Sequence, residues 1–159
     1  MQKNPEYLNN YGAFLINSRN YGEAVIELKR ATSDPLYSTP QFAWTNLAQA
    51  YAGLKDLSAA RDALDRALYL VPNYPPALLM LAELDYNDGK ADAAFAHLQV
   101  VLAQEPDNAD ALLLAGRIAA LRGADNTGTV PLAALCDCFT LFRSRQAGAA
   151  TAAAKRLRR

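Results

Sequence analysis

The chain has little of the residue types from which catalytic and metal sites are built. Its 159 residues include a single histidine, His97, and two cysteines, Cys136 and Cys138. One intervening residue makes an unstrained disulfide between these cysteines unfavourable, and a zinc site needs further ligands that one histidine cannot supply. We therefore expect no metal site, and we expect His97 to be a solvated side chain on an outer helix face.

Catalytic motifs are missing in the same way. The sequence has no nucleophile paired with a base, no glycine-rich phosphate loop and no helix with two spaced metal ligands. We therefore predict that the protein is not an enzyme and uses no cofactor or small-molecule substrate.

Long apolar runs are also missing. The longest candidate, residues 111–121, carries Arg117 and is shorter than the roughly 18 residues that a membrane helix needs. Residues 1–10 are polar and have neither the apolar segment nor the cleavage site of a secretory signal. Because the chain enters a helical pattern almost at once, we interpret it as a fragment or as a sequence with a misplaced start.

Formal charge is balanced over the whole chain but divided unevenly along it. The sequence has 16 Lys+Arg and 16 Asp+Glu, of which residues 124–159 hold 6 and 2, leaving 10 and 14 for residues 1–123. The first part is mildly acidic and the end is basic. A short basic end such as residues 155–159 is usually solvated, so we predict no nucleic-acid partner.

Small and apolar residues recur along the chain at a nearly constant period. The best-fitting unit has Trp44, Leu47, Ala48, Tyr51, Ala60, Leu64, Ala67 and Pro72. Thirty-four positions later stand Leu78, Leu81, Ala82, Asp85, Ala94, Leu98, Val101 and Pro106. An earlier unit has Leu8, Tyr11, Gly12, Leu15, Ala24, Leu28 and Ala31, and a partial later one has Leu112, Ala115, Gly116 and Ala119. This is the spacing of the tetratricopeptide repeat.

The pattern predicts an all-α, right-handed solenoid of antiparallel helix pairs. Small residues let the two helices of a pair approach closely, and Pro72 and Pro106 end the second helix of their units. We predict one tetratricopeptide-repeat domain over residues 5–123, with repeats near 5–40, 41–74 and 75–108 and a partial repeat at 109–123.

The pattern fails after residue 123. Residues 127–131 are poor helix formers, and we predict an atypical C-terminal extension over 124–159, part of it disordered. One explanation is a capping or tethering extension, since terminal repeats are atypical. The other, which we favour, is a change of reading frame, because the segment is rich in alanine and arginine, holds both cysteines and has few acids.

The first helix of each pair lines the inner groove in this fold, and its residues form the predicted site. The predicted groove residues are Asn9, Asn10, Phe42, Asn46, Gln49, Met80, Glu83 and Tyr86. Amide side chains can hydrogen-bond a peptide backbone, and the aromatic and thioether side chains can accept apolar groups. The sequence therefore predicts a protein or peptide partner, although ordinary solvation or helix packing would account for any one of these residues.

Two asparagines match part of a known peptide-binding site, the carboxylate clamp, but we do not expect this chain to bind the chaperone tails that the clamp binds. Asn10 and Asn46 stand where carboxylate-clamp repeat proteins hold the C-terminal carboxylate of chaperone tails. The basic positions of that clamp are occupied by Glu6, Pro76 and Met80. A charge-assisted grip on a carboxylate is therefore missing.

Three short segments resemble the type IV pilus biogenesis family PilF/PilW, a tetratricopeptide-repeat pilotin family. They are Tyr7-Leu-Asn-Asn-Tyr-Gly-Ala-Phe-Leu15, Tyr21-Gly-Glu-Ala24 and Asp34-Pro-Leu-Tyr37. The resemblance covers residues 4–122. It implies a periplasmic lipoprotein on the inner face of the outer membrane that helps the pilus secretin PilQ reach that membrane and assemble.

The resemblance further implies that this chain is the C-terminal part of the repeat array. The family's secretin-binding groove is attributed to repeats further upstream, and neither cysteine stands where a lipid anchor would. Two other functions stay open. One is a generic periplasmic assembly factor, for example for cytochrome c maturation, and the other is a regulatory repeat domain of an enzyme.

Overall fold

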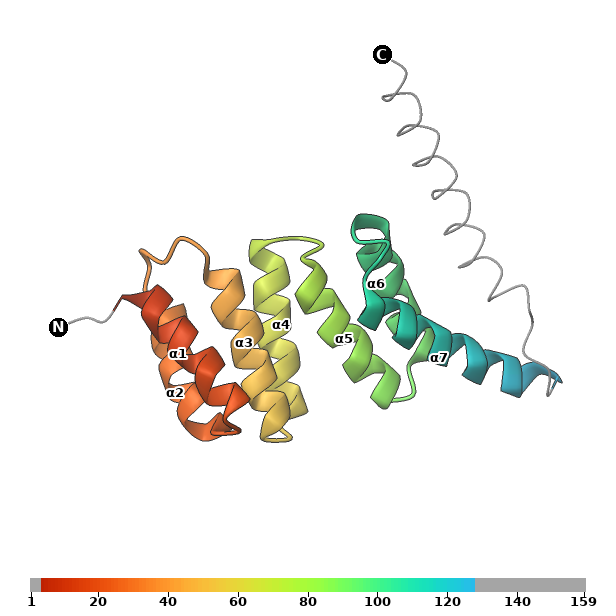
Figure 1. Cartoon of the computed structure of the whole chain (residues 1–159), viewed down its shortest axis with the longest axis horizontal. Coiled ribbons are helices and arrows are strands. Elements are labelled where there is room, and N and C mark those ends of the chain that lie inside the picture. Colours follow the sequence, from red (N-terminus) through yellow and green to blue (C-terminus); the bar gives the residue numbers. More distant parts are fainter. Residues whose placement is uncertain (1–3, 128–159) are drawn as a thin grey trace, which may run out of the picture. The chain divides into compact units, whose positions relative to one another are not determined.

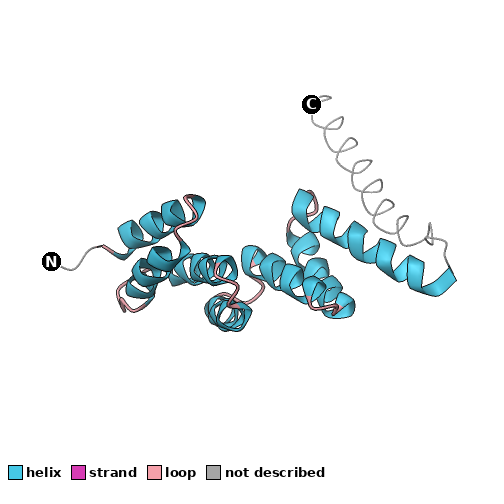
Figure 2. Cartoon of the chain, turned by 90° about the horizontal axis from the view of Figure 1, so that it is seen from below, coloured by secondary structure: helices cyan, strands magenta, loops and turns pink. Residues whose placement is uncertain are grey.

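A computed structural model of the chain describes residues 4–127, and the regular structure in this part is helical throughout (Figures 1 and 2). The helices are α1 (Pro5–Asn17), α2 (Tyr21–Thr32), α3 (Pro40–Gly53), α4 (Leu57–Leu70), α5 (Pro75–Asn87), α6 (Ala91–Gln104) and α7 (Ala109–Thr127). They form two units, one ending at Gln104 and one beginning at Glu105. The predicted all-α class is confirmed.

The first unit is built from three antiparallel helix pairs, each within one predicted repeat. Helix α1 packs on α2, α3 on α4 and α5 on α6 (Figure 1). Neighbouring pairs also touch, because α2 contacts α3, α4 contacts α5 and α1 contacts α3. This is the stacking of a tetratricopeptide solenoid, in which each repeat contacts only its neighbours.

Proline begins the first helix of every pair. Pro5, Pro40 and Pro75 are the first residues of α1, α3 and α5. Proline suits this position because its fixed φ matches the helix and because the first backbone N–H would have no partner within the helix. The sequence thus marks the start of each repeat, and Pro72 and Pro106 follow the ends of α4 and α6.

The turn between the two helices has the same conformation in all three pairs of the first unit. Arg19, Lys55 and Gly89 have φ of 59°, 66° and 77°. In the first turn the Arg19 N–H donates to the Ile16 carbonyl at 2.9 Å and the Asn20 N–H to the Leu15 carbonyl at 2.8 Å. The other two turns repeat these two hydrogen bonds. This is a Schellman motif, which satisfies the last carbonyls of the helix.

Helix α7 does not stop where the repeat period places the next turn. The residue that follows Gly89 in register is Gly123, yet α7 runs through it to Thr127. In the first unit each turn is held by a second helix that packs back on the first, and residues 4–127 contain no such helix after α7. The extension predicted for 124–159 lies outside the described residues from residue 128 on, and the predicted domain limits stay predictions.

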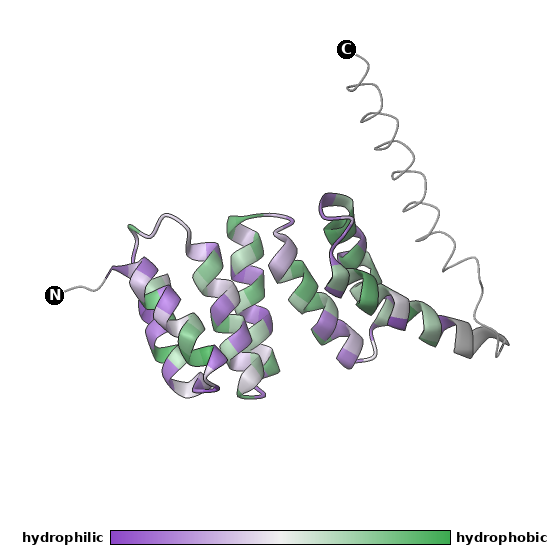
Figure 3. Ribbon diagram, in the orientation of Figure 1, coloured by the Kyte–Doolittle hydropathy of each residue, from purple (hydrophilic) through white to green (hydrophobic). Residues whose placement is uncertain are grey.

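The repeat signature forms the core of the first unit. Leu28, Leu47, Leu64 and Leu98 are almost completely buried, and the small residues Ala24, Ala48, Ala60, Ala82 and Ala94 are fully buried. Each buried leucine contributes about 1.5–3 kcal/mol relative to an exposed one. Apolar residues recur along the helices between hydrophilic ones (Figure 3). Within the described part, no helix is apolar over a stretch long enough to span a bilayer.

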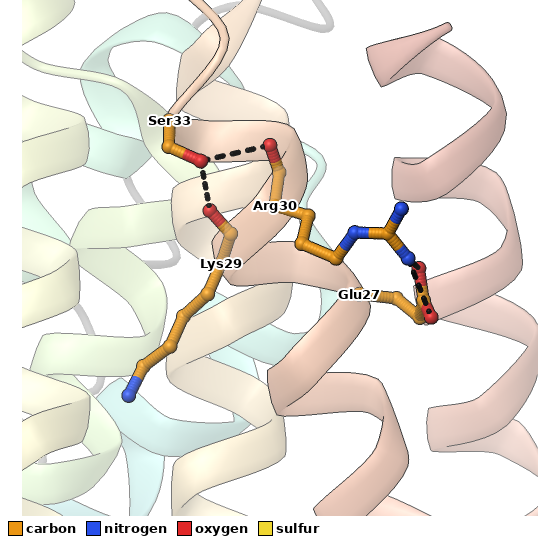
Figure 4. Close-up of polar contacts among 4 residues, drawn as sticks. All are labelled: Glu27, Lys29, Arg30 and Ser33. Atoms are coloured by element: carbon orange, nitrogen blue, oxygen red, sulfur yellow. Dashed lines mark hydrogen bonds and ion pairs between the residues drawn. The ribbon is translucent and has the colours of Figure 1, made fainter. Parts of the chain in front are cut away.

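The Asp34-Pro-Leu-Tyr37 segment lies in the loop between α2 and α3. The Ser33 hydroxyl donates to the carbonyls of Lys29 and Arg30 at 2.9 and 3.0 Å, which closes the end of α2 (Figure 4). The Asp34 carboxylate then accepts the Leu36 N–H at 2.9 Å. Tyr37 is buried in the core, while Leu36 is 88% exposed. Asp34 therefore shapes the turn, and Tyr37 anchors the loop in the core.

Because the paired helices approach closely, we predict that Gly12 does not tolerate a larger side chain. A Cβ added there would lie 2.5 Å from Leu28 Cγ, whereas one added at Gly22 would meet nothing within 4 Å. We expect Gly12→Ala to lower the free energy of unfolding by about 1 kcal/mol or more, because overpacking outweighs the gain in helix propensity. Gly22→Ala should leave it equal or higher. Urea unfolding followed by circular dichroism measures both, and equal midpoints would show that Gly12 does not mark the crossing.

Candidate functional site

The predicted groove residues lie on the first helices of the three pairs. Helix α1 carries Asn9 and Asn10, α3 carries Phe42, Asn46 and Gln49, and α5 carries Met80, Glu83 and Tyr86. Asn10, Phe42, Gln49 and Glu83 are exposed, and the other four are half-buried. The structure therefore divides the set into side chains that face solvent and side chains that also contribute to packing.

Asn9 and Asn46 are brought together across two repeats. The Asn46 side-chain amide donates to the Asn9 side-chain oxygen at 2.9 Å, from α3 to α1. Asn10, which the clamp comparison paired with Asn46, is exposed instead. The pair that the structure forms joins adjacent helices and leaves each amide with unused donor or acceptor capacity for a ligand.

Phe42 lies against an aromatic residue that the sequence did not indicate. Its ring meets Tyr74 edge to face with centroids 6.0 Å apart, and Phe42 is 46% exposed. Burial raises the pKa of Tyr74 above its ordinary value. Met80 packs against the core cluster. Phe42 and Tyr74 therefore form an aromatic pair that is partly exposed, and Gln49 is exposed two turns further along α3.

The Asn9–Asn46 contact predicts coupling between the first two repeats. We expect Asn46→Ala to reduce the free energy of unfolding by about 1 kcal/mol, the usual net value of one hydrogen bond. Asn9→Ala should cost little more once Asn46 has been replaced. A double-mutant cycle measured by urea unfolding tests this, with exposed Asn10→Ala as the matched control. Additive effects of the two changes would contradict the coupling.

A buried carboxylate stands where the repeat pattern has tyrosine. Asp85 on α5 is 5% exposed, and its carboxylate lies 2.8 Å from the Arg61 guanidinium of α4 and 3.4 Å from His97 Nε2 of α6. Arg61 also binds Asp88 at 2.8 Å. Burial lowers the pKa of Arg61, but hydrogen bonds and charge from Asp85 and Asp88 more than offset it and leave the pKa raised.

These contacts correct the expectation that His97 is a solvated side chain. It lies beside a buried carboxylate and its side chain is 33% exposed. Sequence reasoning missed this cluster, although Asp85 in place of the usual tyrosine was a visible sign of a polar site. The partners of Asp85 could not be identified from the sequence, since Arg61 stands 24 positions before it and His97 stands 12 positions after it. The cluster joins the second repeat to both helices of the third.

Removing Arg61 should therefore weaken the second and third repeats together. We expect Arg61→Ala to lower the free energy of unfolding by about 1–3 kcal/mol, since a hydrogen-bonded carboxylate would lose its main partner. Arg66→Ala, at an exposed position of the same helix, should have almost no effect. Thermal unfolding compares the two. Arg61→Leu combined with Asp85→Tyr should recover part of the loss because no buried charge remains; no recovery would contradict this explanation.

No metal centre accompanies this cluster in the described residues, where no three His, Cys, Asp or Glu side chains could together hold an ion. Cys136 and Cys138 lie outside those residues. The predicted groove residues of the first unit comprise amides, aromatic rings, a thioether and the carboxylate of Glu83. Groups of these kinds can bind a peptide by hydrogen bonds and apolar contact.

Comparisons with known proteins agree with the repeat and with the family resemblance. A family model described as tetratricopeptide repeat matches residues 41–74. The type IV pilus assembly protein PilF of Pseudomonas aeruginosa is 31% identical over 117 residues, which is 74% of this chain and 46% of PilF. The chain is a tetratricopeptide-repeat relative of the type IV pilus proteins PilF and PilW. It spans about half the length of the curated PilF that it matches.

Solved structures give the same result. The crystal structure of PilW, titled a widely conserved type IV pilus biogenesis factor, matches with a TM-score of 0.69 and 30% identity, over 79% of this chain and 58% of PilW. Pseudomonas aeruginosa PilF matches with a TM-score of 0.68 and 29% identity, over 79% of this chain and 57% of PilF. A chain of the APC/C Cut9–Hcn1 hetero-tetramer also matches, with a TM-score of 0.67 and 28% identity, over 74% of this chain and 24% of its own.

Proposed function

We propose that the protein is a non-catalytic, protein-binding scaffold for type IV pilus biogenesis. It acts in the assembly or outer-membrane localisation of the pilus secretin, PilQ, at the periplasmic face of the outer membrane. The observation that carries this proposal is the 31% identity to PilF over 74% of the chain. The tetratricopeptide repeats support a role in protein–protein interaction, because stacked repeats display extended binding surfaces.

Exposed side chains on the first helices suit an extended or helical peptide. Asn10 on α1 and Gln49 on α3 can each both donate and accept hydrogen bonds. Phe42, which meets Tyr74 edge to face, is partly exposed, and aromatic anchors carry much of the energy at protein interfaces. A peptide backbone would bind the amides while one of its apolar side chains contacts Phe42.

The same chemistry argues for binding rather than for catalysis. The predicted groove residues offer amide, aromatic and thioether groups and one carboxylate. None of the eight is a cysteine, serine, histidine or lysine, and the one carboxylate, Glu83, has no such residue of the set to pair with as nucleophile and base. A peptide held here would be positioned for delivery to an assembly.

Affinity capture tests the proposal directly. The immobilised chain is incubated with periplasmic and solubilised outer-membrane extract from a piliated bacterium, and PilQ is detected by immunoblot. We expect the triple variant Asn10→Ala, Phe42→Ala, Gln49→Ala to capture at least roughly tenfold less, since two hydrogen bonds and an apolar contact are worth more than about 1.4 kcal/mol.

The control is Tyr69→Ala, which removes an aromatic residue that is 82% exposed on α4, the second helix of its pair. It should capture as much secretin as the unchanged chain. Circular dichroism confirms that each variant is folded. Equal capture by the triple variant would reject the groove, and recovery of cytochrome-maturation proteins without secretin would favour the alternative assembly factor.

A further inference from the structure

The first unit has two junctions between consecutive repeats, and they are built differently. The first junction, between the first and second repeats, contains two helix contacts, α2 with α3 and α1 with α3. The second junction, between the second and third repeats, is made mainly by α4 against α5, and this contact is less extensive than that of α2 with α3. Within the described residues, α3 and α5 make no contact comparable to that of α1 with α3.

Specific side-chain contacts reinforce the first junction, in addition to the hydrogen bond between the two asparagines of α1 and α3. The Tyr21 ring of α2 lies against Gly53 of α3, so closely that an added Cβ would lie 2.5 Å from Tyr21 Cδ1. The Lys29 ammonium of α2 lies 5.5 Å from the centroid of the Tyr51 ring of α3, which is within the range of a cation–π interaction. The first two repeats are therefore held together at several points.

The second junction has different residue types at each of these positions. The equivalents of the asparagine pair, the ring on glycine and the cation on a ring are Thr45 and Met80, Leu57 and Asn87, and Asp65 and Asp85. The Thr45 hydroxyl donates to the Gln41 carbonyl of its own helix at 2.9 Å. Two carboxylates cannot form a cation–π contact. The specific contacts of the first junction are thus not repeated at these positions.

An arginine bridge takes their place. Arg61 of α4 lies 2.8 Å from Asp85 and 2.8 Å from Asp88, both contributed by the third repeat. The other charged groups that face these carboxylates are His97, 3.4 Å from Asp85, and Lys90, 3.6 Å from Asp88. His97 and Lys90 belong to the third repeat themselves. Among these ion pairs, only those of Arg61 cross the second junction.

The apolar core is divided at the same place. One cluster of buried residues runs through the first two repeats and reaches α5 through Ala77, Leu81 and Leu84. The residues buried within the third repeat lie outside that cluster. They are Leu78, Ala82, Ala94, Leu98 and Val101. The first two repeats therefore share one core, and the third repeat adds a face to it while keeping a core of its own.

We propose that the second junction is a hinge of the solenoid. The first two repeats form one rigid block, the third repeat rotates against it, and the Arg61 bridge to Asp85 and Asp88 holds the closed arrangement. Hinges of this kind turn on a few residues at the ends of packed elements. Because Phe42 and Gln49 lie on α3 and the remaining predicted groove residues lie on α5, opening changes the spacing across the groove.

Cysteine reactivity measures this opening. Ala43 of α3 and Ala77 of α5 occupy equivalent positions at the first and second junctions, and both are fully buried. Each is replaced by cysteine in a full chain that carries Cys136→Ser and Cys138→Ser. The rate of reaction with iodoacetamide is measured by mass spectrometry and divided by the rate for the same chain unfolded in urea. We expect Ala77→Cys to react faster than Ala43→Cys, because local opening exposes it without global unfolding.

Variants of Arg61 test whether its bridge closes the hinge. Arg61→Ala should raise the rate at Ala77→Cys, relative to that at Ala43→Cys, by about tenfold or more, since hydrogen bonds to charged groups are lost. Arg61→Lys, which keeps the charge without the planar fork, should give a smaller rise and decides the question if Arg61→Ala does not fold. The exposed control Arg66→Ala should change neither rate.

Two results would overturn the hinge. One is an equal increase at Ala43→Cys and Ala77→Cys in both Arg61 variants, because Arg61 would then stabilise the whole unit rather than one junction. The other is an Ala77→Cys rate in the chain with Arg61 intact that does not exceed the rate of Ala43→Cys.

Discussion

The close crossing of the two helices in each pair is the contact on which the rest of the first unit depends. At Gly12 the backbone of α1 comes so near Leu28 of α2 that even a methyl group would collide. Fully buried alanines occupy the equivalent positions of α3 and α5. Because packed interiors tolerate little added volume, this one requirement sets the helix spacing, the position of the turn and the register of the next repeat.

The spacing in turn decides which side chains remain for function. A first helix uses one side for its own partner, and in α3 and α5 another side faces the preceding pair, so a third side remains to display polar or aromatic groups. Asn10, Phe42 and Gln49 lie there and are exposed. Asn9 and Asn46 lie at its border, where their mutual hydrogen bond joins α1 to α3. The predicted binding surface is therefore a consequence of repeat packing, and a surface built on packed helices loses less entropy on binding than a flexible one does.

Much of this arrangement follows from local sequence patterns. Small residues at a fixed period, a proline at each repeat start and the turn residues Arg19, Lys55 and Gly89 each act within one repeat, so the helices and the buried positions could be predicted. The contacts between repeats could not be predicted in this way. Tyr74 beside Phe42 and the Arg61–Asp85–His97 cluster join residues whose distance in space depends on how neighbouring helices are oriented, which the period does not encode. Helix α7 shows the same limit, since Gly123 suits a turn but no described helix packs back to hold one.

The fold by itself does not distinguish between functions. A chain of the Cut9–Hcn1 complex matches with a TM-score of 0.67, close to the 0.69 of PilW. Function therefore depends on positions that the crossing leaves unconstrained. In this chain such positions include the exposed Asn10, Phe42 and Gln49 on the first helices and the exposed Leu36 in the loop before α3. A partner that discriminates between tetratricopeptide proteins would contact exposed residues of this kind, since the buried signature is inaccessible to it.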